Sequence, residues 1–248
     1  KGSCIITCSY EARAYGICTG MRVKEAKKLC SSFLRLPSNP ILYAKISADI
    51  MNSLREITPD IEVFSVDEAF LDMTCCKKIW DSPESIAKKI KEKVFSVSGV
   101  HCSIGISGDK TTAKYAAKLH KPNGLTIISP WDAENTLKDI PVLELCGINR
   151  GIGAFLAKRG IFSCGEVKKI PISVLGQRFG NPGRRIWYMC QGKDPEEVKN
   201  NIKEPKTIGH GKVMPPNTRS KNVIYMYLTH MSEKVAQRLR KNTLCAQK

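Results

Sequence analysis

The sequence of 248 residues lacks the short motifs that mark several common enzyme classes. It contains no GxxxxGK(S/T) phosphate-binding loop, no GxGxxG dinucleotide fingerprint, no GxSxG nucleophile elbow and no HExxH zinc motif. A simple nucleoside triphosphatase, a Rossmann dehydrogenase, a serine hydrolase and a zinc-dependent protease therefore lose their main support.

Histidine is scarce, and the cysteines are not spaced as metal ligands or as a disulfide framework. There are four His and eleven Cys, an odd number, scattered singly except for Cys75–Cys76 and without a CxxC pair. We therefore expect reduced thiols, most of them filling the core.

Long apolar runs are also missing. No run approaches the ~20 residues that a bilayer span needs, and the opening KGSCIITCSY has no apolar stretch of signal-peptide type. We expect a soluble intracellular protein with no membrane partner, cytoplasmic in a bacterium or nuclear in a eukaryote. Because residue 1 is Lys, we also expect the sequence to be a fragment of a longer protein.

Positive charge is abundant. The chain has 40 Lys and Arg against 23 Asp and Glu, a net charge of +17, and 42% hydrophobic residues, enough to close a core. Residues 199–248 hold 11 of the cations and only two acids, Glu204 and Glu233. This concentration favours a surface that follows a polyanion such as nucleic acid, with a solvated helix face as the alternative.

The order of apolar patterns predicts an α+β layer over residues 40–129, with its helices on one face, followed by a small helical region over 132–200. A hinge is expected at 203–205. The expected strands are 3–8, two runs that meet at Asp67–Glu68, 102–107, 125–129 and the strand-like segment 207–214. The expected helices are 22–30, 42–57, 84–96, 110–120 and 222–241.

The strongest chemical signal is SVDEAFLD, which places two adjacent carboxylates, Asp67 and Glu68, between apolar residues. Neighbouring residues of a regular strand point to opposite faces, so a shared site requires a bend, which a hairpin provides. Two carboxylates at such a bend are hard oxygen ligands suited to Mg²⁺. The alternative is an exposed acidic turn, which the flanking apolar residues disfavour.

Two further motifs can recognise phosphate. In SYEARAYG, Tyr10 and Arg13 are three residues apart and share a face if the segment is helical. In AAKLHKPNG, Lys121 lies at a helix end before Pro122. The alternatives are an ordinary amphipathic turn and a lysine that complements the helix dipole.

The segment LELCGINRGIGAFLAKRGI, residues 143–161, has the pattern of a helix, a tight turn at Gly147, Ile148 and Asn149, and a second helix. Backbone N–H groups at such a turn can bind a DNA phosphate without reading bases. Asn149 stands where the pattern usually has a second Gly, and Asn tolerates a left-handed φ better than most residues. A turn used only for packing is the alternative.

Taken in chain order, SYEARAYGICTGM, SVDEAFLD, AAKLHKPNG and the helix-hairpin-helix pattern resemble the Y-family of translesion DNA polymerases, nearest its bacterial DNA polymerase IV type. The resemblance implies an α+β fold with right-hand architecture. Its parts are the fingers over 1–38, a palm over 39–128, a helical thumb over 129–203 and the start of an incomplete little finger over 204–248.

The resemblance also implies roles for single residues. Asp67 and Glu68 match the catalytic carboxylates that hold two Mg²⁺ ions, and Gly147, Ile148 and Asn149 match a contact with the DNA backbone. The groups that match contacts to the incoming triphosphate are Thr7, Tyr10, Arg13 and Lys121.

The implied activity is nucleotidyl transfer from deoxynucleoside triphosphates to the 3′-OH of a primer on template DNA. A sliding clamp is a further partner, expected to bind through a segment outside this sequence. The family carries another metal-binding Asp upstream of the position of Lys1, so we expect the 248 residues alone to have no useful polymerase activity.

Two other functions are alternatives to this one. A non-catalytic DNA-binding repair module of the same fold would have lost the acidic pair, yet Asp67 and Glu68 are both present. A cyclic-dinucleotide synthase would show a GG(D/E)EF-like turn in place of SVDEAF and would lack the DNA-binding turn.

Overall fold

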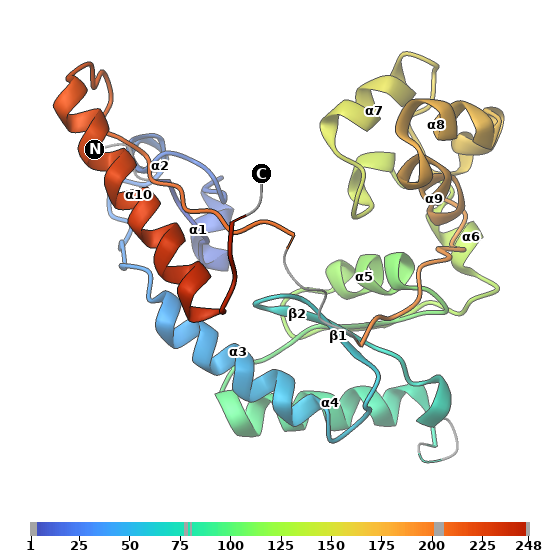
Figure 1. The fold of residues 1–248 in the computed structure, drawn as a ribbon. Helices are drawn as coiled ribbons and strands as arrows, with labels where there is room; N and C mark the ends of the chain where they lie inside the picture. The colour runs from blue at the N-terminus through green and yellow to red at the C-terminus, as the bar shows by residue number, and fades with distance from the viewer. Residues whose placement is uncertain (1–3, 77–78, 80, 201–205, 247–248) are drawn as a thin grey trace. The chain divides into compact units, whose positions relative to one another are not determined.

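The computed structural model of the chain describes residues 4–76, 79, 81–200 and 206–246 (Figure 1). The chain forms two units. One consists of Lys1–Asn39 and Lys203–Lys248, and the other is the continuous stretch Pro40–Ile202. The predicted hinge at 203–205 lies outside the described residues. No helix in the described part of the chain is long and apolar enough to cross a membrane.

The N-terminal segment holds two short helices, α1 (Tyr10–Ala14) and α2 (Val23–Leu29). The predicted strand at 3–8 was wrong for the residues that the structure describes, because Cys4 alone pairs, in an isolated antiparallel bridge with Arg22. Ile6 is 67% exposed. A strand needs a neighbouring ladder to satisfy its backbone, and this segment has only one bridged residue.

The C-terminal segment contains α10 (Lys221–Lys241), within one residue of the predicted helix. The strand predicted over 207–214 was wrong, since these residues have no regular secondary structure and Val213 is 92% exposed. The Arg238 guanidinium donates instead to the Gly209 carbonyl. Alternation of apolar and polar residues does not make a strand when no strand edge lies beside it.

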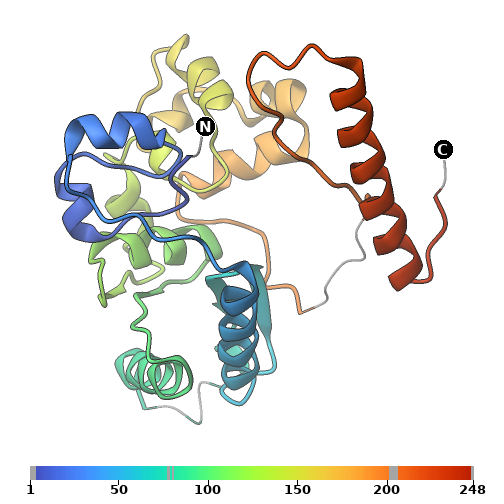
Figure 2. The same ribbon diagram turned by 90° about the vertical axis from the view of Figure 1, so that its left-hand side faces the viewer.

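The second unit begins with the predicted α+β region, and its elements agree with the expected fold class (Figure 2). The antiparallel hairpin β1–β2 and the parallel pair β3–β4 form two separate two-stranded sheets. Helix α5 joins the parallel strands. The elements are α3 (Pro40–Leu54), β1 (Ile61–Ser65), β2 (Glu68–Leu71), η1 (Thr74–Cys76), α4 (Pro83–Ser98), β3 (Ile104–Ile106), α5 (Lys110–Leu119) and β4 (Leu125–Ile127).

Helices contact both faces of the β1–β2 hairpin, contrary to the expectation that they lie on one face. On one face, Ile61 packs in a core with Met51 and Leu54 of α3 and Ile90 and Val94 of α4. On the other face, lysines of α5 reach the hairpin.

Helix α5 lies close to β3 because Gly105 has no side chain. A Cβ at that position would be 2.0 Å from the Ala113 carbonyl oxygen of α5. The absence of a side chain at Gly105 therefore allows α5, the helix that carries these lysines, to pack closely against β3.

The remainder of the second unit is helical, as predicted. Its apolar core includes Leu137, Leu156, Val167 and Leu175 and extends to Tyr115 of α5. The elements are α6 (Ala133–Leu137), η2 (Val142–Glu144), α7 (Arg150–Ala157), η3 (Gly165–Lys169), α8 (Ile172–Phe179) and α9 (Asn181–Met189).

The cysteines do not mostly fill the core, so that expectation was wrong. Only Cys76, Cys164 and Cys190 are buried, whereas four of the eleven are exposed. Cysteine is often a core residue in folded proteins, but its position in each element decides its burial here.

Candidate functional site

Asp67 and Glu68 lie at the tip of the β1–β2 hairpin, as predicted. Ser65 pairs with Glu68 across the strands, and a register shift between Val63 and Ser65 places an extra residue in β1. The Ser65 hydroxyl lies 2.7 Å from Asp67 Oδ1 and 3.4 Å from Glu68 Oε2. The bend and the bulge thus bring the two carboxylates to one hydroxyl, although regular strand geometry would separate them.

The strand register puts the side chains of Glu62, Phe64, Glu68 and Phe70 on one face of the hairpin. Glu62 is opposite Phe70, and residues two apart on a strand share a face. Phe64 and Phe70 meet edge to face with their ring centroids 5.4 Å apart. Lysine side chains of α5 reach this aromatic face, on which Phe64 stays 46% exposed.

Two lysines one turn apart on α5 lie over these rings. Lys110 Nζ is 2.7 Å from Glu62 and 5.1 Å from the Phe70 centroid. Lys114 Nζ is 2.5 Å from Glu68 Oε1 and 4.5 Å from the Phe64 centroid. Each lysine therefore has one carboxylate and one ring as neighbours.

The acidic pair fits Mg²⁺ by its donor chemistry. It offers carboxylate oxygens at a hairpin tip, Asp67 being exposed and Glu68 half-buried. Within the described ranges, no cluster of three or more His, Cys, Asp or Glu could enclose a metal ion. An open pair of carboxylates suits Mg²⁺, which keeps several waters and takes further ligands from substrate phosphates.

The predicted phosphate-binding residues lie in both units. Tyr10 and Arg13 share a face of α1, with the guanidinium carbon 5.1 Å from the ring centroid, as the spacing predicts. Thr7 precedes that helix and is exposed. Lys121 is exposed just after α5, in the unit that carries Asp67. Thr7, Tyr10 and Arg13 belong to the other unit. That they act in one site with Asp67 and Glu68 therefore stays a prediction.

The turn at Gly147, Ile148 and Asn149 precedes α7, but it differs from the predicted helix-hairpin-helix in two ways. The first helix is only the 3₁₀ turn η2, and Asn149 has an extended backbone with φ −85°. Gly147 takes the left-handed conformation instead, with φ +93°.

Asn149 acts as the N-cap of α7. Its Oδ1 accepts from the Ile152 N–H at 3.0 Å, which satisfies one of the free donors of the first turn. A hollow of about 360 Å³ runs along α7 from Asn149 to Lys158, and its lining also includes Arg178.

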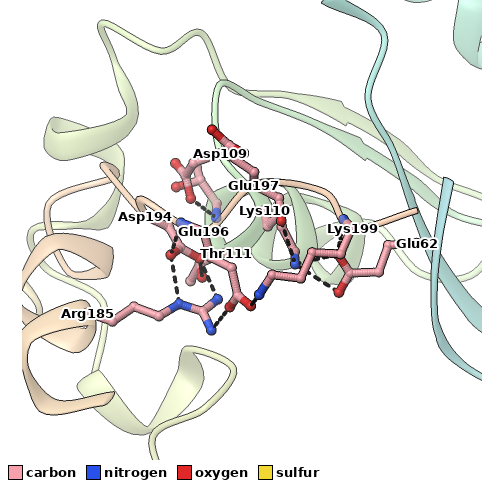
Figure 3. Close-up of polar contacts among 10 residues, drawn as sticks. Glu62, Asp109, Lys110, Thr111, Arg185, Asp194, Glu196, Glu197 and Lys199 are labelled. Atoms are coloured by element: carbon pink, nitrogen blue, oxygen red, sulfur yellow. Dashed lines mark hydrogen bonds and ion pairs between the residues drawn. The ribbon is translucent and has the colours of Figure 1, made fainter. Parts of the chain in front are cut away.

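A buried polar network that the sequence did not reveal connects α5 to the segment after α9 (Figure 3). Asp194 accepts from Arg185 Nε at 2.8 Å, from Arg185 Nη2 at 2.7 Å and from the Thr111 hydroxyl at 2.6 Å. The hydrogen bonds that Arg185 donates to Asp194 raise the pKa of Arg185. Burial raises the pKa of the neighbouring Asp109.

The same segment reaches the hairpin through Glu62. Its carboxylate binds Lys110 Nζ and accepts from the Lys199 N–H at 2.8 Å. Burial by itself would raise the pKa of Glu62, but the bonds to Lys110 and Lys199 outweigh it and lower the pKa. No local motif marks these residues, because the partners are 48 and 137 positions apart.

Comparison with known proteins shows which proteins this chain resembles. The impB/mucB/samB family model matches residues 1–118. DNA polymerase IV of Moorella thermoacetica is 37% identical over 238 residues, which cover 95% of this chain and 60% of the relative. DNA polymerase IV of Lactococcus lactis is 34% identical, with 97% of this chain and 66% of the relative covered.

The structural match agrees with the sequence matches. The Y-family DNA polymerase chimera Dbh-Dpo4(243-245)-Dbh superposes with a TM-score of 0.83 at 28% identity, covering 95% of this chain and 69% of the chimera. The chain is thus similar in sequence to DNA polymerase IV relatives and in fold to a Y-family DNA polymerase. It spans 60% of the length of the Moorella relative and 58% of that of another DNA polymerase IV.

Proposed function

We propose that the protein to which this chain belongs is a DNA-directed DNA polymerase of the translesion type, which adds deoxynucleotides to a primer 3′-OH on template DNA. The observation that carries the proposal is the pair Asp67 and Glu68 at the hairpin tip, within a fold that superposes on a Y-family polymerase. The names of the relatives support the same activity.

In this proposal the chain follows the right-hand plan. Residues 1–38 are the fingers, 39–128 the palm, 129–203 the thumb and 204–248 the start of the little finger. Asp67 and Glu68 would hold two Mg²⁺ ions, which when bound promote ionisation of the primer 3′-OH and offset charge on the leaving pyrophosphate. A sliding clamp stays a predicted partner.

The protein's own residues would bind and orient the substrates. Arg13 can grip the triphosphate with a planar pair of donors, while the hydroxyls of Thr7 and Tyr10 and the ammonium of Lys121 add further donors. Cations around the phosphates stabilise the negative charge that moves to the leaving group.

The turn of Gly147, Ile148 and Asn149 would hold the DNA backbone without reading its sequence. Lys158 and Arg178, which line the hollow along α7, supply positive charge for the same polyanion. DNA affinity should therefore fall steeply as salt rises, and a binding constant that stays flat between low and physiological salt would contradict these phosphate contacts.

The test is primer extension by the whole protein carrying Asp67→Asn. This change preserves shape but removes the charge that a divalent cation needs, so extension should be lost while DNA binding, followed by fluorescence anisotropy, stays within about twofold. Glu92→Gln, at an exposed position on α4, is the matched control and should extend normally. Extension by Asp67→Asn at the unaltered rate would overturn the proposal. DNA binding without extension by the unaltered protein would support the non-catalytic module instead.

A further inference from the structure

Lys110 and Lys114 make the same kind of contact with the hairpin but differ in exposure. The Lys110 side chain is 7% exposed and its partner Glu62 18%, whereas Lys114 is 24% exposed and its partner Glu68 41%. Both lysines lie on the face of α5 that is turned toward the hairpin. The Lys110–Glu62 pair is therefore largely shielded from water, whereas water and ions can reach the Lys114–Glu68 pair.

The Lys110 ammonium is held by several acceptors at once. It contacts both oxygens of Glu62, at 2.9 and 2.7 Å, and the Glu197 carbonyl at 3.3 Å. Glu62 in turn accepts from the backbone of Lys199. Release of Lys110 would leave a carboxylate and an ammonium poorly solvated, so this pair stays closed.

Lys114 is placed differently. Its ammonium binds Glu68 Oε1, while the other oxygen of Glu68 faces the Ser65 hydroxyl that also binds Asp67. The lysine thus neutralises part of the charge of the acidic pair and holds Glu68 beside Asp67. The Phe64 ring, 4.5 Å from the ammonium, offers a second favourable position through its negative face.

We propose that Lys114 is a positioning residue that holds Glu68 ready in the metal-free site and competes there with the divalent cation. This inference rests on the proposed function, since it takes Asp67 and Glu68 as the metal ligands. A cation on Glu68 meets the positive charge of Lys114 at close range, so metal binding weakens the ion pair and the ion pair weakens metal binding. The lysine thereby keeps metal affinity moderate.

The experiment measures Mn²⁺ binding to this chain by the electron paramagnetic resonance signal of free Mn²⁺, without DNA or nucleotide. Lys114→Met keeps an apolar stem over Phe64 and removes the charge. We expect it to bind Mn²⁺ about fivefold more tightly, the size of effect that one partly exposed charge exerts. Lys114→Arg should bind within about twofold of the unaltered chain.

The matched control is Lys118→Met, which removes the same charge one turn further along α5. Lys118 pairs with Glu144 and is 56% exposed. Its removal should leave Mn²⁺ affinity within about twofold. The gain from Lys114→Met should shrink at high salt, because an exposed charge is screened.

The outcomes separate this inference from the proposed function. Loss of binding in Asp67→Asn with no gain in Lys114→Met overturns the role of Lys114 and leaves the metal site standing. Absence of Asp67-dependent Mn²⁺ binding in the unaltered chain overturns the role of Lys114, whereas primer extension by the whole protein decides the proposed function. If Lys114→Met does not fold, Lys114→Gln replaces it in the experiment. Lys114→Gln should then also bind Mn²⁺ about fivefold more tightly than the unaltered chain.

Discussion

Arg185 and Asp194 form a two-pronged ion pair, with Nε 2.8 Å from Oδ1 and Nη2 2.7 Å from Oδ2, and the Asp194 side chain has no exposed surface. The carboxylate also accepts from Thr111 of α5. One buried group therefore joins the middle of α9, the segment that follows this helix and the helix that carries Lys110 and Lys114. The position of the segment after α9 therefore depends on the pairing of the Asp194 carboxylate with Arg185.

Asp194→Asn is expected to lower the free energy of unfolding by about 2–3 kcal/mol, because it breaks a buried ion pair from one side. Urea unfolding measures the change. Glu196→Gln is the control, since Glu196 also contacts Arg185 but is 24% exposed, and it should cost less than about 1 kcal/mol. Equal losses in the two variants would show that burial of Asp194 does not matter.

Lys110→Met is expected to destabilise the fold by about 2 kcal/mol or more, because it leaves Glu62 without the cation that offsets its burial. Thermal and urea unfolding of the variant provide the measurement. Lys118→Met, which removes an exposed lysine from the same helix, should change stability by less than about 1 kcal/mol. A neutral effect of Lys110→Met would mean that the hairpin does not depend on this pair.

Asn149→Ala is expected to lower stability by about 1 kcal/mol through loss of the N-cap of α7. Asn149→Asp should keep most of the stability, since Asp accepts the same bond and suits the positive end of the helix dipole. Urea unfolding distinguishes the two variants. Equal stability of Asn149→Ala and the unaltered chain would contradict the capping role.

Glu166 should contribute to stability in a pH-dependent way. Its bond to Lys169 and its bonds from the Phe162 and Ser163 N–H groups lower its pKa from 4.5 to about 2. The folded state therefore prefers the ionised form, and the stabilisation is complete above pH about 4.5 and disappears as the pH falls to about 2.

The measurement compares thermal unfolding of the chain with that of Glu166→Gln between pH 3 and pH 7, with the Glu166 carboxyl titration followed by NMR. The stability advantage of the unaltered chain should be largest near neutral pH and should shrink below pH about 4.5. An advantage that grows on acidification would reverse the sign of this linkage and contradict the assignment.

Local patterns were sufficient for the longer helices and for the acidic hairpin. Helix α10 begins and ends within one residue of its predicted bounds, because apolar spacing is a property of the segment itself. The strands predicted at 3–8 and 207–214 did not form in the described residues. A strand depends on a partner edge that its own sequence does not supply.

The candidate site likewise has features that local sequence predicts and contacts that only the fold creates. The sequence by itself determined the motif of Asp67 and Glu68 and the shared face of Tyr10 and Arg13, because each rests on residues close together in the chain. Only the tertiary structure decided that Lys114 lies on Glu68 and that Asp194 binds Arg185 and Thr111. Contacts between distant segments follow from packing, as where Gly105 lets α5 approach β3, and no local pattern encodes them.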